Sequence, residues 1–353
     1  MSGPVTLGAA LGRGRENNLD LLRLVAASAV VVSHAWPLAL GRGAVEPLEA
    51  ALGLSLGGVA VLVFFFLSGM LISASAAADR QERGRFVLKR VLRIYPGLAV
   101  ALIVTVLIAV DGGATAGFGE LVTYVLRGLS LVSLQHEISG ALVGTPYGSV
   151  VNGPLWTLFY EVLCYGVIAS AIWSGLLDRV WGWVCLAGAS LMLWAFPEMI
   201  SQQVAPALAY RLNTLAPLLL AFVSGAVFWR LRDWMVLDWR AGIALLAGAS
   251  LVAGQGSALP LMIVAMGYGL CLLAFRLPAV SPGMDLSYGI YIYGWPVAQF
   301  VLCYVGPATP GMLALLSLSA VLPVAFLSWH LVEKPALSLI KRNRFRAHRV
   351  VSP

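Results

Sequence analysis

Several ionisable side chains lie inside long apolar stretches of this sequence, where a charge is costly and asks for a reason. In the stretch 18–34, Arg23 and His34 are eleven residues apart. Eleven positions of an α-helix return to within about 20° of the same face and rise roughly 16 Å. One helix face would therefore carry a guanidinium near one end and an imidazole far along it. Asp20, three residues before Arg23, is placed to pair with it.

The chemistry that this face suggests is proton transfer by His34. Histidine is the commonest general base near neutral pH, because its ordinary pKa is about 6.5. A lone histidine in an apolar helix can also do no more than hydrogen-bond a neighbouring helix. Of the two interpretations, the residues alone favour a functional one.

Two arginines, Arg90 and Arg93, precede an apolar run in the stretch 89–96. They are three positions apart, so they project from one helical face. Paired guanidinium groups suit bidentate binding of phosphate. Basic residues at the end of a membrane span also set its orientation, and the residues alone favour this second interpretation.

A carboxylate, Glu161, lies in the apolar stretch that follows Trp156. Thr157, Glu161 and Tyr165 are spaced i, i+4 and i+8, so they form a polar stripe on one helix face. Glu161 would lie roughly 14 Å from the membrane surface at 1.5 Å per residue. A carboxylate there must face protein or water and needs a partner. Bracing an Arg or His of another helix and direct chemistry are equally open roles.

The stretch 287–296 is aromatic and glycine-rich. Tyr288, Tyr291 and Trp295 share a helical face, and Pro296 is expected to kink the helix. An aromatic belt and close packing through small residues explain much of this pattern.

The elements that must hold these residues are membrane helices. Of 353 residues, 60% are hydrophobic and only 11% are charged, and the mean hydropathy is +0.88. This is too little charge to cover the surface of a soluble domain. The four cysteines lie in apolar stretches without metal-ligand spacing, so we expect neither disulfides nor a metal site. The predicted fold class is all-α, a polytopic integral membrane protein.

Apolar runs of about 18 or more residues can cross the hydrocarbon core of a bilayer as helices. The runs here predict about ten transmembrane helices, which form a domain at 19–335. A segment at 1–18 and a basic tail at 336–353 are both expected in the cytoplasm. The predicted spans are 19–40, 53–76, 87–110, 152–174, 180–197, 211–229, 240–255, 258–275, 286–305 and 311–332.

The distribution of Lys and Arg supports this topology. With the N-terminus inside, every Lys and Arg except Arg42, Arg127 and Arg211 falls on the cytoplasmic side, as the positive-inside rule predicts. The cytoplasmic residues include Arg15 and the basic tail. The net charge of +7 is then a topology signal that also attracts anionic lipid, with no need for nucleic acid as a partner.

One predicted connection is unusually long. Residues 111–151 contain an amphipathic stretch near Glu120 to Leu134, followed by a piece rich in Gly, Pro and Tyr. We interpret it as an interfacial helix and a loop over the outer mouth of the helix bundle. A plain connector is an equal alternative.

Six short motifs follow one another along residues 17–337. They are Asp20-Leu-Leu-Arg23 with His34, Phe65-Phe66-Leu67-Ser68-Gly69, Arg90-Val-Leu-Arg93-Ile-Tyr-Pro96, Gly153-Pro-Leu-Trp156-Thr-Leu-Phe-Tyr-Glu161, Ser287-Tyr288-Gly-Ile-Tyr291 and Glu333-Lys-Pro335. In this order they resemble the acyltransferase-3 family of bacterial membrane O-acyltransferases. The first and third motifs are fairly specific in combination, and each is weak alone.

Two positions depart from the family's pattern. Members often have two adjacent acidic residues where this chain has Glu161-Val162, so only Glu161 carries over. Members often read Trp-His-Trp-Pro in the ninth span, whereas this chain has Gly294 at the place of that histidine.

The resemblance implies transfer of an acyl group, usually acetyl from acetyl-CoA, to a hydroxyl of a carbohydrate or glycolipid at the bacterial cytoplasmic membrane. It implies that His34 is the essential histidine, acting as general base or acyl relay, and that Glu161 orients or charge-balances the imidazole. No permanently bound cofactor is implied. The residues expected to bind the acyl-CoA or the acceptor are Arg23, Arg90, Arg93, Asp20, Trp156, Tyr160 and Tyr288.

The main alternative is a transporter or flippase of a lipid-linked glycan or small molecule. Intramembrane His, Glu and Arg also suit proton-coupled transport. The two halves of the sequence show no inverted repeat and no paired broken helices, which many such transporters have.

Overall fold

The computed structural model describes residues 5–14, 16–280 and 283–340. Within these ranges, helices form at all ten places where the sequence predicts a span. Seven of the described helices are long and apolar enough to cross a membrane, and two shorter helices are also apolar. The all-α prediction is confirmed, while ten spans and cytoplasmic termini stay predictions. Arg15 and the predicted basic tail beyond residue 340 lie outside the described residues.

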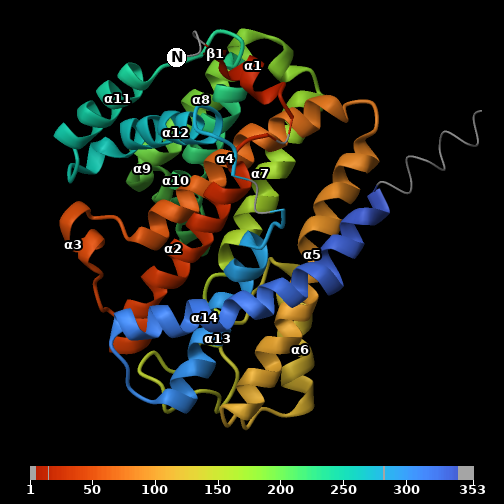
Figure 1. The fold of residues 1–353 in the computed structure, drawn as a ribbon, viewed down its shortest axis with the longest axis vertical. Helices are drawn as coiled ribbons and strands as arrows, with labels where there is room; N and C mark the ends of the chain where they lie inside the picture. Colours follow the sequence, from red (N-terminus) through yellow and green to blue (C-terminus); the bar gives the residue numbers. More distant parts are fainter. Residues whose placement is uncertain (1–4, 15, 281–282, 341–353) are drawn as a thin grey trace, which may run out of the picture. The chain divides into compact units, whose positions relative to one another are not determined.

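Figure 1 labels the helices in chain order. The long apolar helices are α2 (Leu19–Leu40), α4 (Leu56–Ala78), α5 (Arg83–Asp111), α7 (Trp156–Trp173), α10 (Pro206–Leu231), α12 (Leu259–Phe275) and α14 (Pro310–Ser328), which a π-helical turn, η3 (Trp329–Glu333), extends. The shorter apolar helices are α8 (Val180–Ala195) and α11 (Trp239–Leu251), and α13 (Ser287–Val305) occupies the predicted ninth span. The remaining short elements are α1 (Leu7–Leu11), α3 (Pro47–Leu52), α6 (Phe118–Ser130), α9 (Pro197–Ser201), the 3₁₀ turns η1 (Leu176–Asp178) and η2 (Gly256–Ala258), and strands β1 (Val5–Thr6) and β2 (Val236–Leu237).

The chain divides into two compact units, each built from three segments. The first unit comprises Met1–Ala26, Leu48–Gln81 and Tyr160–Gly283, and the second comprises Ala27–Pro47, Glu82–Phe159 and Met284–Pro353. Helices α2 and α7 therefore contribute residues to both units.

In the first unit, α4 and α10 pack so closely that glycine is required where they meet. A Cβ atom added to Gly69 would overlap the carbonyl oxygen of Phe222, and one added to Gly225 would overlap that of Phe66. Small residues let two membrane helices approach to backbone contact. The glycine of the second predicted motif therefore has a packing role.

The N-terminal segment is fastened within the first unit. Strand β1 pairs antiparallel with β2, a two-stranded sheet that was not predicted because strands of two residues carry no periodicity. Asn18, buried at the start of α2, donates from Nδ2 to the carbonyl of Pro278 at 3.0 Å and accepts from the backbone N–H of Val280 at 2.6 Å. These bonds hold the start of α2 against the chain that follows α12.

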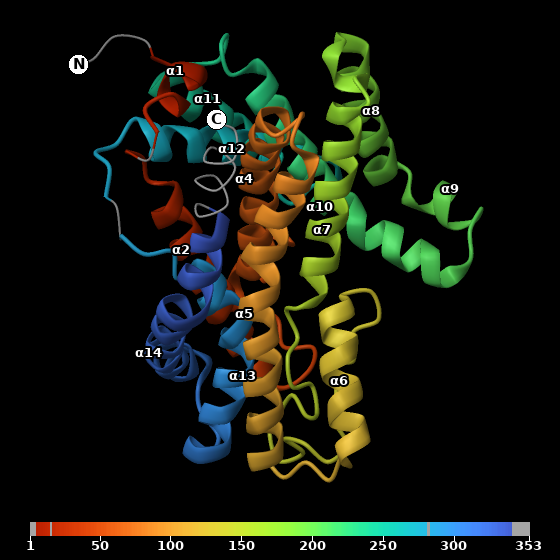
Figure 2. The same cartoon turned by 90° about the vertical axis from the view of Figure 1, so that its right-hand side faces the viewer.

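In the second unit, α13 packs against both α14 and α5, as Figures 1 and 2 show. A Cβ atom added to Gly289 of α13 would lie 2.9 Å from the Cβ of Ala325 in α14. The later half of α2 joins the same core through Ala35 and Leu38, which are buried with Trp295 of α13 and with side chains of α14. This core fixes the helix segment that carries His34.

The amphipathic helix α6 runs beside α5 in the second unit (Figure 2). It faces α5 through Gly128, whereas Phe118 and Leu126 are exposed. The predicted amphipathic stretch 120–134 is therefore a helix, but it ends early because Leu131 adopts the left-handed conformation, with φ of 60°. The interfacial position of α6 stays a prediction.

Candidate functional site

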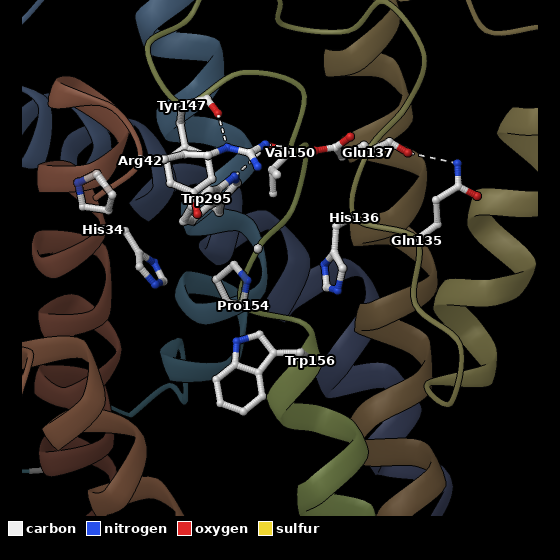
Figure 3. Close-up of a pocket in the computed structure, with 12 residues that line it drawn as sticks. His34, Arg42, Gln135, His136, Glu137, Tyr147, Val150, Pro154, Trp156 and Trp295 are labelled. Atoms are coloured by element: carbon white, nitrogen blue, oxygen red, sulfur yellow. Dashed lines mark hydrogen bonds and ion pairs between the residues drawn. The ribbon is translucent and has the colours of Figure 1, made fainter. Parts of the chain in front are cut away.

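A pocket of about 700 Å³ lies in the second unit, and the His34 side chain forms part of its wall (Figure 3). The pocket joins α2, the loop between α6 and α7, the start of α7, and α13. Its lining residues are His34, Pro37, Arg42, Gln135, His136, Glu137, Tyr147, Val150, Gly153, Pro154, Trp156 and Trp295.

The local packing of α2 and α13 sets the orientation of the His34 ring. Ala35 and Leu38 face the buried core, so His34 is left on the pocket side of α2. The imidazole meets the indole of Trp295 edge to face, with ring centroids 5.0 Å apart and planes at 77°. This geometry is one that aromatic rings favour. His34 is therefore half-buried and held by packing on one side.

Hydrogen bonds hold the loop of the pocket wall to α13. The carbonyl of Val150 accepts from Trp295 Nε1 at 2.9 Å and from Gln299 Nε2 at 3.1 Å. Asn152 donates to the carbonyl of Ile292 at 3.1 Å. Both amide side chains are almost completely buried, where hydrogen bonds are expensive to break. The loop therefore forms part of the pocket wall, and its position over the outer mouth of the bundle stays a prediction.

The same loop is also paired with itself across the pocket wall. Glu137 and Val150 form an isolated antiparallel bridge, and the N–H of Val151 donates to the carbonyl of His136 at 2.9 Å. Gln135 donates to the carbonyl of Glu137 at 2.9 Å. The backbone that carries His136 and Glu137 is thus fixed to the part of the loop that α13 holds.

An ion pair closes one side of the pocket. Arg42 Nη2 lies 2.9 Å from Glu137 Oε1, and Arg42 Nε donates to the carbonyl of Tyr147 at 3.1 Å. The guanidinium also lies over the Tyr147 ring, 5.2 Å from its centroid, and that ring contacts Trp295 edge to face at 4.9 Å. The hydrogen bond from Arg42 holds the pKa of Glu137 below its ordinary value.

A second imidazole, His136, faces the pocket from the loop. Figure 3 shows His34 and His136 on either side of Pro154, with Trp156 beside them. His136 and Trp156 are exposed in the pocket wall. The structure thus offers two proton-accepting rings and a flat indole face to a molecule bound there.

Arg93 and Tyr288, both expected to bind substrate, belong to another cluster in the second unit. Arg93 Nη2 lies 2.5 Å from Asp285 Oδ2, and both side chains are mostly buried. The guanidinium lies over the Tyr288 ring at 5.6 Å, and the Tyr288 hydroxyl donates to the carbonyl of Ile94 at 2.7 Å. Glu333, 2% exposed, accepts from Ser328 at 2.9 Å nearby. The contacts of Arg93 and Tyr288 tie α5 to α13 and the residues just before it.

The predicted polar stripe of α7 is used in two places. Glu161 accepts in the first unit from Ser68 of α4 at 3.2 Å, and the Tyr165 hydroxyl donates to the same oxygen. Thr157 hydrogen-bonds Tyr291 of α13 at 2.6 Å in the second unit. The carboxylate therefore has hydroxyl partners, as the sequence requires.

The remaining predicted site residues lie on three helices. Asp20 and Arg23 are in the first turns of α2, and Tyr160 is buried in α7, all in the first unit. Arg90 lies on α5 with its guanidinium 5.8 Å from the centre of the Phe86 ring. Among the described residues, no cluster of three or more His, Cys, Asp or Glu side chains could hold a metal ion.

Four polar lining residues were not predicted from the sequence, namely Gln135, His136, Glu137 and Tyr147. They lie in an irregular loop, where no periodicity indicates which side chains share a surface. One available signal was Arg42, which breaks the predicted charge bias and turns out to be the ion-pair partner of Glu137.

Comparisons with known proteins agree with these motifs. The model of the acyltransferase 3 family, described as an acyltransferase domain, matches residues 16–330. The chain is 30% identical to an O-acetyl transferase of Shigella phage Sf6, over 92% of this chain and 97% of that protein. It is 29% identical to nodulation protein 10 of Rhizobium leguminosarum bv. viciae, over 92% and 94%, and 27% identical to exopolysaccharide production protein ExoZ of Rhizobium meliloti (strain 1021), over 84% and 93%. No solved structure matches the chain.

Proposed function

Because the chain belongs to the acyltransferase 3 family and is a multi-pass membrane acyltransferase, we propose that it moves acetyl from cytosolic acetyl-CoA to a hydroxyl of a carbohydrate or glycolipid. A relative named O-acetyl transferase supports the acetyl group, and one named exopolysaccharide production protein supports a carbohydrate acceptor. We place the protein in the bacterial cytoplasmic membrane with both termini inside. The transporter alternative finds no support in these relatives.

The observation that carries the proposal is the position of His34 in the wall of the pocket. An imidazole can accept a proton only from a group that reaches it. Here the ring lines a space of about 700 Å³ together with polar and aromatic side chains. A space of that size holds a ligand of several rings.

The reaction needs one proton acceptor and one leaving group. A ring nitrogen of His34 accepts the proton of the acceptor hydroxyl while the hydroxyl oxygen attacks the thioester carbonyl. The carbon–sulfur bond then breaks, and the CoA thiolate leaves and takes the proton from the imidazolium. In the relay version, a ring nitrogen of His34 attacks the thioester carbonyl, the carbon–sulfur bond breaks, and the CoA thiolate leaves with the N–H proton of the imidazole. The acceptor hydroxyl then takes the acetyl group, and its proton returns to the imidazole.

For the donor, we propose Arg23 and Arg90 as phosphate-binding groups and Asp20 and Tyr160 as further contacts. Arg93 and Tyr288 contribute as positioning residues, since the Arg93 guanidinium is already engaged by Asp285. This refines the expectation that both Arg90 and Arg93 hold phosphate. We propose Trp156 as a wall of the acceptor pocket, and Glu161 as the catalytic carboxylate.

The test compares His34→Ala with His330→Ala in purified protein in lipid, supplied with labelled acetyl-CoA. His330 is a matched control, because its Nδ1 lies 3.0 Å from the carbonyl of Phe326 within its own helix and it does not line the pocket. Loss of a general base costs about 10²–10⁴ in rate, so His34→Ala should lose acetyl transfer and His330→Ala should keep it. Equal CoA release by His34→Ala and His330→Ala would contradict the proposal. Trapping of acetylated His34 without acceptor would select the relay.

A further inference from the structure

The permanently charged side chains of the pocket wall cancel one another. Among the lining residues, Arg42 is the one arginine or lysine and Glu137 the one carboxylate, and they are paired at 2.9 Å. Tyr147 and the imidazoles of His34 and His136 add groups that form hydrogen bonds. The wall therefore offers hydrogen-bonding groups without net charge.

We propose that this pocket is an acceptor subsite that selects an uncharged, hydroxyl-rich ring over a ring bearing a carboxylate. The Arg42–Glu137 pair sets that selectivity. The inference rests on the proposed transfer to a carbohydrate hydroxyl and names the kind of ring that is accepted.

The lining chemistry matches a neutral sugar ring. Trp156 presents a partly exposed indole, whereas Trp295 is buried and Arg42 covers the ring of Tyr147. An exposed indole face can bury the apolar C–H face of a pyranose, whereas the sugar hydroxyls need donors and acceptors at the edge. Gln135 and His136 supply those at the opposite wall.

An anionic ring would meet Glu137 without a free cation to bind it. Arg42 already gives Nη2 to Glu137 and Nε to the carbonyl of Tyr147. A second carboxylate would either displace Glu137 or lie beside it, and like charges brought together disfavour a partner strongly. The pair thus discriminates by repulsion as well as by fit.

The loop is built to keep Glu137 in place when a ligand arrives. Its backbone bridges Val150, whose carbonyl is held by Trp295 and Gln299. The backbone at Glu137 is therefore fixed relative to α13, and the contact with Arg42 holds its carboxylate. A fixed charge discriminates better than one that can turn away.

The experiment changes the charge and keeps the shape, with Glu137→Gln. Two probes are compared, a glucose trisaccharide and the same trisaccharide ending in glucuronate, by mass spectrometry of acetylated product with acetyl-CoA. The wild type should have a kcat/KM about tenfold or more higher for the neutral probe than for the glucuronate probe. Glu137→Gln leaves the Arg42 charge without its carboxylate, so it should lower this ratio by about tenfold. The double variant Arg42→Gln/Glu137→Gln removes both charges. Its preference for the neutral probe should lie between that of the wild type and that of Glu137→Gln. Asp178→Asn, which breaks an exposed Arg80–Asp178 pair in the first unit, is the control and should match the wild type.

Binding without donor, measured by saturation-transfer NMR in lipid nanodiscs, gives the same comparison for a probe that binds but is not acetylated. A wild type without preference for the neutral probe, or a preference that Glu137→Gln leaves unchanged, overturns the inference. Probe binding that Trp156→Ala does not weaken also overturns the inference. The proposed function fails separately, when CoA release persists in His34→Ala.

Discussion

The buried ion pair between Arg93 and Asp285 gives a quantitative prediction about stability. Its two side chains are only 16% and 14% exposed. Asp285 uses both oxygens, since Oδ2 contacts Arg93 and Oδ1 accepts from the Ser287 hydroxyl at 2.5 Å. Asp285→Asn either keeps an acceptor for Ser287 and turns its amide N–H groups toward the guanidinium, or gives Arg93 a neutral oxygen and leaves Ser287 without that acceptor.

Removing one partner of a buried ion pair typically costs about 3–5 kcal/mol, because the other charge is left uncompensated. Glu333 lies in the same cluster, and its Oε2 has no hydrogen-bond donor among the described residues. That carboxylate can partly take over from Asp285. We therefore expect Asp285→Asn to lower the free energy of unfolding by about 3 kcal/mol, at the lower end of that range.

The assay is reversible unfolding by SDS titration in mixed micelles, followed by tryptophan fluorescence. Asp178→Asn is the matched control, since Asp178 contacts Arg80 at 2.8 Å through both oxygens but the two side chains are 54% and 37% exposed. Exposed ion pairs contribute little, so this control should unfold with the wild type. The double variant Arg93→Gln/Asp285→Asn should recover much of the loss, because no charge is then stranded.

Equal unfolding curves for Asp285→Asn and Asp178→Asn would refute the reasoning. That result would mean that the Arg93 charge is satisfied without Asp285. A double variant that is no more stable than Asp285→Asn would count against a stranded charge as the cause.

Two further predictions concern packing and pH. Gly69→Ala should prevent normal packing of α4 on α10, because its Cβ would overlap the carbonyl of Phe222. The free energy of unfolding should fall by about 1–3 kcal/mol or more. The control Gly166→Ala, where a Cβ meets nothing within 4 Å, should stay folded in size-exclusion chromatography. The lowered pKa of Glu137 means that its ion pair stabilises the fold above the ordinary glutamate range and is lost as pH falls through its folded-state pKa. Because both side chains of this pair are exposed, Glu137→Gln should change the SDS-unfolding midpoint only slightly at pH 7. That small difference should stay constant down to about pH 5 and shrink below about pH 4; a difference that grows on acidification would contradict this sign.

The positions of the helices could be predicted because membrane spans depend on local properties. An apolar run of sufficient length must satisfy its backbone as a helix in lipid. The ends were less exact for local reasons too. The second predicted span begins at Leu56 and not at 53, because the Ser55 side chain accepts from the N–H of Gly58 and caps the helix. The fourth begins at Trp156 and not at 152, since the preceding backbone is held against α13.

The candidate site was predictable only where burial makes a residue type costly. His34 and Glu161 stand out because an ionisable side chain in an apolar run needs a reason. The structure gives Glu161 two hydroxyl partners and places His34 in the pocket wall against Trp295. Glu137 and His136 carry no such signal, since a polar residue in a loop is ordinary. Glu137 pairs with Arg42, 95 positions away in sequence, and the bond from Gln299 to Val150 that holds the same loop spans 149 positions. No local pattern encodes such pairing.

Arg42 connects the topology to the chemistry of the pocket. On the predicted outer side of the membrane, a lone arginine works against the positive-inside bias. Here its charge is matched by Glu137 from the loop, and its planar group also stacks on Tyr147. A lysine would supply the charge but not the second, directed hydrogen bond to the Tyr147 carbonyl or the stacking face. The ion pair itself is exposed and adds little to stability, so the geometry of this arginine is better explained by the pocket that it shapes than by the fold.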